Sequence, residues 1–109
     1  MDSLVPFEEF RKLELKIAEI ISAVDHPNAD KLIVLKVRIG EREKQIVAGI
    51  KLHYPAASLV GKKIVIVDNL EPAVIRGETS EGMLLAASEG DLLTLVIPEK
   101  EIPSGAKVK

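Results

Sequence analysis

The sequence of 109 residues contains no cysteine. This absence excludes disulfide bonds, thiol nucleophiles and thiolate metal sites, and it fits a reducing compartment. No apolar run approaches the roughly 20 residues that a membrane-spanning helix needs, and the first residues do not begin a signal peptide. The composition therefore predicts a soluble, cytoplasmic protein without membrane contact, and the length predicts a single domain over residues 1–109.

Aromatic residues are nearly absent, because there is no tryptophan and only Phe7, Phe10 and Tyr54 are present. Proteins that bind single-stranded nucleic acids stack successive bases on exposed aromatic rings. Phe7 and Phe10 belong to an apolar stripe, so unstacked bases would find almost no platform. If the partner is a nucleic acid, a folded RNA recognised by its shape and phosphate positions is the better candidate.

Charge is distributed unevenly, although the formal net charge is only −2. Residues 1–30 hold three basic and seven acidic side chains, residues 31–76 hold nine and four, and residues 77–109 hold three and six. A basic middle segment between acidic ends favours a polyanionic partner on one face. Chance clustering on a solvated surface explains the same counts as well.

Alternation of apolar and polar residues predicts five principal strands. The first begins at Leu13 and changes phase at Ala18, which indicates a β-bulge, and it ends in the turn over residues 25–30. The others cover residues 31–39, 44–49, 62–68 and 83–87, and a further extended segment covers residues 92–97.

Two short helices complete the expected fold. One lies within residues 51–60 and begins near Tyr54, and the other covers residues 5–13, where Phe7 and Phe10 form a stripe that must dock on the barrel or on a second copy of the chain. Five strands with a helix between the third and fourth predict an all-β OB-fold, a five-stranded barrel, with N- and C-terminal extensions. This architecture binds oligonucleotides through its second and third strands and its loops.

Motifs of catalysis are missing. The sequence has no defensible Ser-His-Asp arrangement and no G-x-S-x-G, and its carboxylates are scattered. Gly61-Lys62 suggests a phosphate-binding loop, but the first glycine of that motif falls at Ala56, and Lys63 replaces the required Ser or Thr. We therefore expect no catalytic residues and no cofactor.

The two histidines have ordinary explanations. His26 lies between Asp25 and Asp30, but His-Pro-Asn is typical of a turn, and a lone histidine lacks the remaining ligands of a metal site. His53, at the start of the expected short helix, is either a surface residue or a phosphate contact. We expect no metal.

The segment 69–87 is the expected binding surface, because a loop containing Arg76 leads through a corner at Ser80 into an apolar strand at Met83. The serine hydroxyl can bond a phosphate, a ribose or a base edge, and the thioether of Met83 can lie against a base. In the alternative interpretation, Ser80 caps a turn and Met83 fills the core.

Six segments in a fixed order carry a resemblance that runs from about Phe10 to Ser88. They are His-Pro-Asn-Ala-Asp-Lys-Leu (26–32), Gln-Ile-Val-Ala-Gly-Ile (45–50), Leu-Val-Gly-Lys-Lys (59–63), Asn-Leu-Glu-Pro (69–72), Arg-Gly (76–77) and Ser-Glu-Gly-Met-Leu-Leu-Ala-Ala (80–87). As a set they resemble the tRNA-binding domain of free-standing tRNA-binding proteins, of the C-terminal region of methionyl-tRNA synthetase, of its yeast cofactor and of the endothelial monocyte-activating cytokine.

The resemblance implies a non-catalytic OB-fold that binds the outer corner of the tRNA L without regard to sequence and assists methionyl-tRNA synthetase, as its C-terminal domain or in trans. The family's binding positions correspond to Ser80, Met83 and Lys31. From charge and loop position we add four further tRNA-binding candidates, which are Asn28, Lys51, Asn69 and Arg76.

Bacterial members of the family are homodimers joined through their terminal additions. The resemblance therefore implies that residues 1–12 and 92–109 contribute to a dimer interface. Its candidate residues are Phe7, Phe10, Leu95, Ile97 and Pro98. The alternative function is a dimerisation scaffold for a synthetase, with incidental RNA contact, and an enzyme for a small molecule ranks third because it would need a deep pocket lined by carboxylates.

Two positions depart from the family pattern. Glu71 stands where a lysine is common, and Val74 stands where a basic residue is common. Both changes remove positive charge from the expected binding loop. They predict a weaker affinity or a contact that is shifted toward Lys31 and Lys51.

Overall fold

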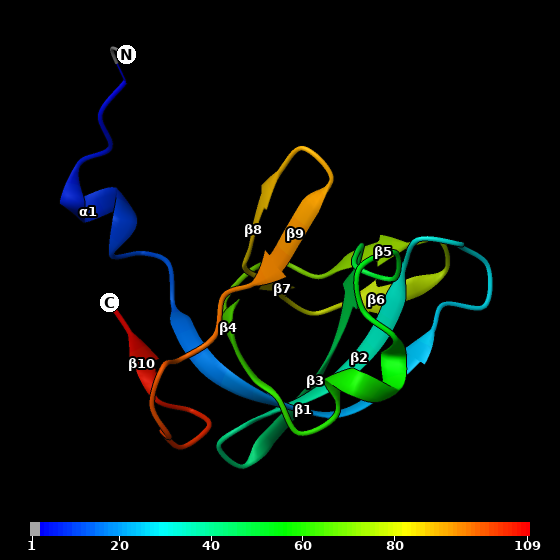
Figure 1. The fold of residues 1–109 in the computed structure, drawn as a ribbon. Coiled ribbons are helices and arrows are strands. Elements are labelled where there is room, and N and C mark those ends of the chain that lie inside the picture. Colours follow the sequence, from blue (N-terminus) through cyan, green and yellow to red (C-terminus); the bar gives the residue numbers. More distant parts are fainter. Residues whose placement is uncertain (1–2) are drawn as a thin grey trace.

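The computed structural model describes residues 3–109 and has one curled antiparallel sheet as its centre (Figure 1). Its strand order is β3-β2-β1-β4-β7, and β10 pairs with β1. The bounds of these strands are β1 Leu15–Asp25, β2 Ile33–Ile39, β3 Arg42–Ala48, β4 Lys63–Val67, β7 Met83–Leu84 and β10 Lys107–Val108. The expected five-stranded, OB-like fold is confirmed as a half-barrel.

Strand β1 serves both halves of the sheet. Residues Leu15 to Glu19 pair with β4, and Glu19 to Asp25 pair with β2, with a register shift between Ile20 and Ser22. A bulge bends a strand and increases its twist, so a single long strand can curl around the core. The change of phase in the sequence is thus confirmed as a bulge, which lies at Ile21.

The core consists mainly of β-branched side chains that suit a pleated sheet. Strand β2 presents Ile33, Leu35, Val37 and Ile39 to it, all at most 3% exposed, whereas Lys36 points to solvent, as the alternation predicts. Strand β4 is buried on both faces, also as predicted. Ile20, Ile46, Leu59, Ile64 and Ile66 complete the largest fully buried side chains.

The helix expected between the third and fourth strands is a single 3₁₀ turn, Ala56–Leu59. Pro55 precedes it in an extended conformation, and Leu59 enters the core with no exposed surface. The hydroxyl of Tyr54 accepts a hydrogen bond from the backbone N–H of Leu95 at 3.1 Å. This contact holds the end of β9 (Leu92–Leu95) against the barrel.

The segment between β4 and β10 differs from the sequence prediction. Instead of one strand over residues 83–87, the chain forms β7 in the main sheet and then β8 (Ala86–Glu89), which pairs with β9 as a separate hairpin. The preceding loop contains another hairpin, β5 (Ala73–Ile75) with β6 (Glu78–Ser80). All four residues of β8 are exposed, because this small, polar stretch has too little apolar surface to remain in the core.

Helix α1 and strand β10 lie on the same side of the barrel (Figure 1). The N-terminal helix α1 spans only Phe7–Phe10, which is shorter than the expected residues 5–13, and no side chain caps it. A four-residue helix gains few hydrogen bonds and depends on its surroundings. Among residues 3–109, no helix is long and apolar enough to cross a membrane.

Candidate nucleic-acid interface

Four of the predicted binding residues gather at one end of the barrel. Asn28 and Lys31 lie in the turn between β1 and β2, and the backbone N–H of Lys51 donates to the carbonyl of Lys31 at 3.3 Å. Arg76 lies at the tip of the β5–β6 hairpin, which a hydrogen bond joins to the same turn. The structure therefore brings Asn28, Lys31, Lys51 and Arg76 into one region.

His26 makes this junction. Its side chain is 4% exposed, its Nδ1 atom accepts from the N–H of Asn28 at 3.0 Å, and its Nε2 atom lies 3.1 Å from the carbonyl oxygen of Ile75. The turn interpretation of His26 is therefore correct, and among residues 3–109 no group of three His, Asp or Glu side chains could hold a metal ion.

Arg76 has an unusual backbone. The β5–β6 hairpin has a two-residue loop, Arg76-Gly77, with φ angles of 53° and 93°. Two positive φ angles are the requirement of a type I′ turn, which prefers Asn-Gly. Arginine is unfavourable there, and such local strain is often found where the side chain has a function.

The cations differ in how far their charge is already neutralised. Lys51 lies 3.5 Å from a carboxylate oxygen of Asp25, and Arg38 lies 2.6 Å from Glu19. Lys31 and Arg76 are exposed and have no ion pair among residues 3–109. Their charges are thus the most available to a polyanion at this end of the barrel.

Ser80 lies at the seam between β3 and β7 rather than at the surface. It is 4% exposed, its Oγ accepts from the N–H of Val47 at 2.9 Å, and it donates to the carbonyl of Gly82 at 2.9 Å. The expectation that its hydroxyl faces an RNA does not match this geometry, because the donor is used within the chain. Ser80 instead shapes the corner that precedes Met83.

Glu81 completes the seam. Its carboxylate accepts from the N–H of Gln45 at 2.8 Å, and its own N–H donates to the carbonyl of Gln45 at 2.7 Å. Unpaired N–H groups on a strand edge need partners. Side chains of the corner therefore supply to β3 the acceptors that a neighbouring strand would otherwise supply.

Met83 is 48% exposed, so the alternative that it fills the core is wrong. Its backbone pairs with Val67 in the main sheet. The neighbouring Gly82 fits closely, because a Cβ atom there would lie 2.9 Å from the carbonyl oxygen of Val67. A rigid corner thus presents a flexible, polarizable side chain to solvent.

Asn69 is committed to the N-terminal segment. Its Oδ1 accepts from the N–H of Glu14 at 2.8 Å, and its Nδ2 donates to the carbonyl of Lys12 at 2.7 Å. The structure does not bring Asn69 to the group around His26. Its side-chain amide anchors the segment between α1 and β1.

Asp68 is the centre of a charge cluster that the sequence analysis did not identify. Its carboxylate is 4% exposed and lies 2.6 Å from Arg42, 2.8 Å from Lys44 and 3.4 Å from Lys16. Burial alone raises the pKa of Asp68, but the hydrogen bonds and charges of Lys44 and Arg42 outweigh it and lower the pKa from 3.8 to about 2. The carboxylate is therefore ionised at neutral pH.

The residues expected at a dimer interface are split. Phe7 and Phe10 are 70% and 41% exposed, and Ile97 is also exposed, whereas Leu95 is 5% exposed and packs in the core of its own chain. Leu95 is thus not available to a second chain, because this end of β9 lies against the barrel, where the N–H of Leu95 donates to the hydroxyl of Tyr54. Pro98 is half-buried.

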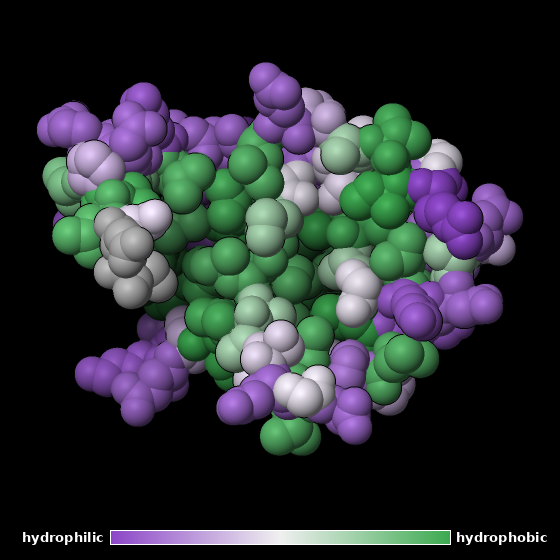
Figure 2. All heavy atoms as spheres, turned by 90° about the horizontal axis from the view of Figure 1, so that it is seen from above, coloured by the Kyte–Doolittle hydropathy of each residue, from purple (hydrophilic) through white to green (hydrophobic). Residues whose placement is uncertain are grey.

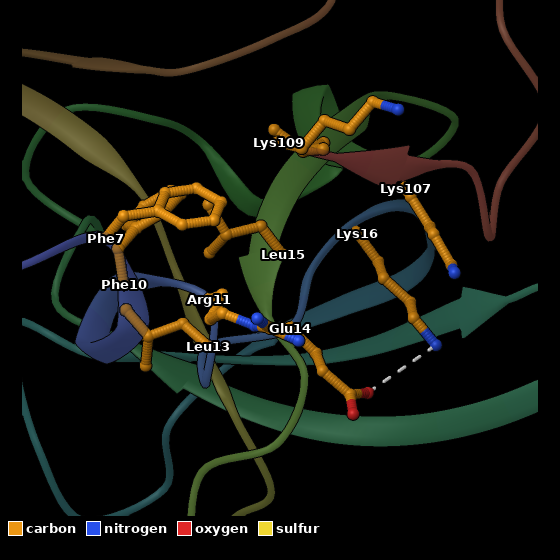
Figure 3. A pocket seen from close by; sticks show the side chains of 10 residues that line it. Phe7, Phe10, Arg11, Leu13, Glu14, Leu15, Lys16, Lys107 and Lys109 are labelled. Carbon is orange, nitrogen blue, oxygen red and sulfur yellow. Dashed lines mark ion pairs between the residues drawn. The ribbon is translucent and has the colours of Figure 1, made fainter.

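A groove of about 490 Å³ lies between the two ends of the chain. Figure 3 shows the rings of Phe7 and Phe10 on the side of Leu15, with Lys16 and Lys107 across the groove. Figure 2 shows that hydrophobic side chains cover the middle of the face seen from above, with hydrophilic residues around it. Exposed apolar patches of this kind commonly mark interaction surfaces.

The sequence did not indicate that His26 and Glu81 join distant segments of the site or that Asp68 holds a charge cluster. A signal exists for Asp68, which directly follows the buried run 63–67 and must therefore find charged partners. The distant partner of His26, Ile75, lies 49 positions away and that of Glu81, Gln45, lies 36 positions away, and no local pattern indicates either.

Comparison with known proteins identifies relatives of the whole chain. It is 48% identical over 105 residues to the methionine–tRNA ligase of Thermococcus kodakarensis and 42% identical over 105 residues to that of Halalkalibacterium halodurans. In both cases the similarity covers 96% of this chain but only 14% and 16% of the ligase. The chain thus resembles one part of those enzymes.

Solved structures share the same fold. A methionyl-tRNA-synthetase-related protein from Pyrococcus horikoshii has a TM-score of 0.92 and 36% identity, and covers 98% of this chain and 99% of its own. The chaperone CsaA from Bacillus anthracis has a TM-score of 0.90 and 31% identity, with 98% and 100% covered. Residues 15–107 match the family described as "Putative tRNA binding domain", and the chain belongs to this family.

Proposed function

We propose that this chain is a non-catalytic module that binds the outer corner of folded tRNA through the barrel end that carries Lys31 and Arg76. The observation that carries the proposal is the convergence of these two exposed cations, which have no ion pair among residues 3–109, in a member of a tRNA-binding family. Phosphate contacts of this kind supply affinity and register without reading sequence.

The other tRNA-binding candidates have secondary roles in this proposal. Asn28 lies in the same turn as Lys31 and offers an amide to a phosphate or ribose, and Lys51 contributes a partly neutralised charge. Met83 offers an exposed thioether for a sugar or base. Ser80 contributes by fixing the corner, and Asn69 by fixing the N-terminal segment.

The relatives support a methionine–tRNA ligase as the partner in this proposal. The chain is similar to one part of methionine–tRNA ligases. We therefore propose that it increases the affinity of such a ligase for tRNA in the cytoplasm, either as a domain of the enzyme or in trans. The scarcity of aromatic side chains favours folded tRNA over single strands.

A salt series with two RNAs tests the proposal. Binding of mixed tRNA and of an unstructured RNA of equal length is measured by filter retention at increasing salt. Tighter binding of tRNA, with an affinity that falls steeply with salt, is the expected result. Equal affinity for both RNAs, or a flat salt response, would refute the proposal.

Arg76→Asn separates binding from stability. Asparagine suits the left-handed conformation at φ 53° better than arginine does, so the free energy of unfolding is expected to stay the same or rise by up to about 1 kcal/mol. Loss of the guanidinium is expected to weaken the binding of all tRNAs by about tenfold. Urea unfolding and filter binding measure the two effects.

The control for this variant is Lys62→Asn, which removes an exposed cation from the loop before β4. It is expected to change tRNA affinity by less than about threefold. An equal loss of affinity in both variants would indicate a general effect of net charge and would contradict a specific role for Arg76.

We also propose a homodimer in which a second copy covers exposed apolar side chains of the two terminal segments, among them Phe7, Phe10 and Ile97. The double change Phe7→Ser and Phe10→Ser is expected to convert a dimer into a monomer, because it removes the apolar area that a second copy would cover. Gel filtration with light scattering measures the mass. Leu52→Ser, at an exposed apolar position outside both terminal segments, is the control and is expected to leave the mass unchanged.

The dimer variants also discriminate the alternative function, a dimerisation scaffold with incidental RNA contact. A scaffold predicts that the monomeric variant loses its effect on the ligase, whereas Arg76→Asn and Met83→Ala leave that effect intact. A binding module predicts that Arg76→Asn removes most of the effect. The methionylation rate at limiting tRNA provides this measurement.

A further inference from the structure

His26 is the only buried histidine among residues 3–109, and both of its ring nitrogens have partners. The backbone N–H of Asn28 can only donate, so Nδ1 must be the unprotonated acceptor. In the neutral ring, Nε2 then carries the hydrogen and donates to the carbonyl of Ile75 at 3.1 Å. One side chain thus joins two loops that lie 49 positions apart.

The hydrogen bond from His26 to the carbonyl of Ile75 restricts the backbone conformation of the next residue, Arg76. The carbonyl of Ile75 belongs to the peptide group that leads into Arg76, whose φ angle is 53°. Fixing this peptide plane restricts the rotation that would relax the arginine to a negative φ angle. The surrounding structure must hold a strained turn, and the bond from His26 to Ile75 is a contact that does so in addition to the pairing of β5 with β6.

The other side of the bridge carries the remaining cations. His26 also accepts from Asn28, three residues before Lys31, and the carbonyl of Lys31 accepts from Lys51. Lys51 lies 3.5 Å from Asp25, the neighbour of His26. The turn, Lys51 and the hairpin tip therefore form one connected unit.

We propose that His26 is a positioning residue that sets the spacing between the cations of the β1–β2 turn and Arg76, and that this spacing provides the preference for folded RNA. A flexible strand adapts its phosphates to any arrangement of cations, whereas a folded RNA presents them at fixed positions. The inference rests on the proposed function and adds to it the residue that confers selectivity.

Two substitutions each remove one of the two hydrogen bonds of His26 and keep the other. In His26→Asn, the amide oxygen can still accept from the N–H of Asn28, as in an Asx turn, but the side chain is too short to reach Ile75. In His26→Gln, the terminal amide occupies the place of Nε2 and can donate to Ile75, while the bond to Asn28 is lost. His26→Asn is expected to weaken tRNA binding by about tenfold, and His26→Gln by less than about threefold.

The readout is the ratio of affinities for tRNA and for an unstructured RNA of equal length, measured at a temperature at which circular dichroism shows each variant to be folded. His26→Asn is expected to lower this ratio while the affinity for unstructured RNA stays within about twofold. A purely structural role would lower both affinities together. Unchanged preference for tRNA in folded His26→Asn would overturn the inference.

A double-mutant cycle with Arg76→Asn tests whether His26 affects tRNA affinity through Arg76. If His26 acts through Arg76, the loss caused by His26→Asn shrinks to less than about threefold in the Arg76→Asn background. Additive losses would overturn the inference. Wild-type protein without any preference for tRNA would instead refute the proposed function, so the two failures are distinguishable.

The wild-type chain provides a test that needs no substitution. The ¹⁵N chemical shifts of the His26 ring identify which nitrogen is protonated. In the neutral ring, a protonated Nε2 and an unprotonated Nδ1 are the expected result. The opposite tautomer would exclude the bond to Ile75 and overturn the inference even if both variants fail to fold.

Discussion

Ser80→Ala is expected to lower the free energy of unfolding by about 2–4 kcal/mol, which is a large effect for the loss of one oxygen atom. The Oγ atom accepts from Val47 and donates to Gly82, and all three residues are buried. Without it, one N–H and one carbonyl lose their partners in a region that water does not easily reach, at about 1–3 kcal/mol each. Urea unfolding followed by circular dichroism measures the loss.

Thr79→Ala is the matched control, because Thr79 precedes Ser80 in β6 and its side chain is exposed. The control is expected to change the free energy of unfolding by less than about 0.5 kcal/mol. If the two variants are equally stable and only Ser80→Ala loses tRNA affinity, the hydroxyl acts on the RNA. This result would contradict the structural role of Ser80 between Val47 and Gly82.

The case of Ser80 illustrates which part of the site was not predictable. The motif Ser-Glu-Gly-Met indicates a corner, but the sequence does not tell whether a hydroxyl in a corner faces solvent or the neighbouring strand. That choice depends on β3, because its N–H groups lack a paired strand on this side. The partner of Ser80 on β3 is Val47, which lies 33 positions away in the sequence.

The main sheet was predictable because its information is local. Period-two alternation over residues 33–39 determines which face of β2 is buried, and the apolar run over residues 63–67 indicates a strand covered on both sides. The change of phase near Ala18 likewise indicated the bulge, although its position shifted to Ile21. In these elements local pattern and tertiary environment agree.

The segment 69–97 was predicted less well because its elements are short. Strands β5, β6 and β7 have three, three and two residues, too few for a period to be recognised. Their pairing depends on the two-residue loop at Arg76 and on the close fit of Gly82 against Val67. Lys31, taken from the family resemblance, lies near Asn28, Lys51 and Arg76, which were added from charge and loop position. Asn69, added on the same grounds, lies elsewhere, against the N-terminal segment.

Stability is expected to fall in acid through Asp68. The pKa of this carboxyl is about 2 in the folded chain, below its ordinary value of 3.8, so the folded state favours the ionised form. Its contribution is therefore fully present above about pH 4 and is lost as the pH falls from 3.8 through about 2. A shift of this size corresponds to about 2 kcal/mol.

Asp68→Asn isolates this contribution from the other carboxyl groups. At neutral pH the substitution keeps the shape but leaves Lys16, Arg42 and Lys44 without their common counter-charge. We expect a loss of about 2–4 kcal/mol, at or below the usual cost of breaking a buried ion pair because Arg42 is half exposed. Urea unfolding of both proteins between pH 7 and pH 2 measures the difference between them.

The pH profile of this difference separates charge from packing. If the carboxylate stabilises the fold through the three cations, the difference between wild type and Asp68→Asn stays constant down to about pH 4 and then shrinks by about 2 kcal/mol by pH 2. Asp91→Asn, at an exposed position in the β8–β9 turn, provides the control and is expected to give a flat difference near zero. A difference in Asp68→Asn that does not change with pH would mean that the cluster contributes through packing alone.

Because Asp68 precedes the loop that carries Arg76, a loosened cluster is also expected to lower the affinity for tRNA at neutral pH.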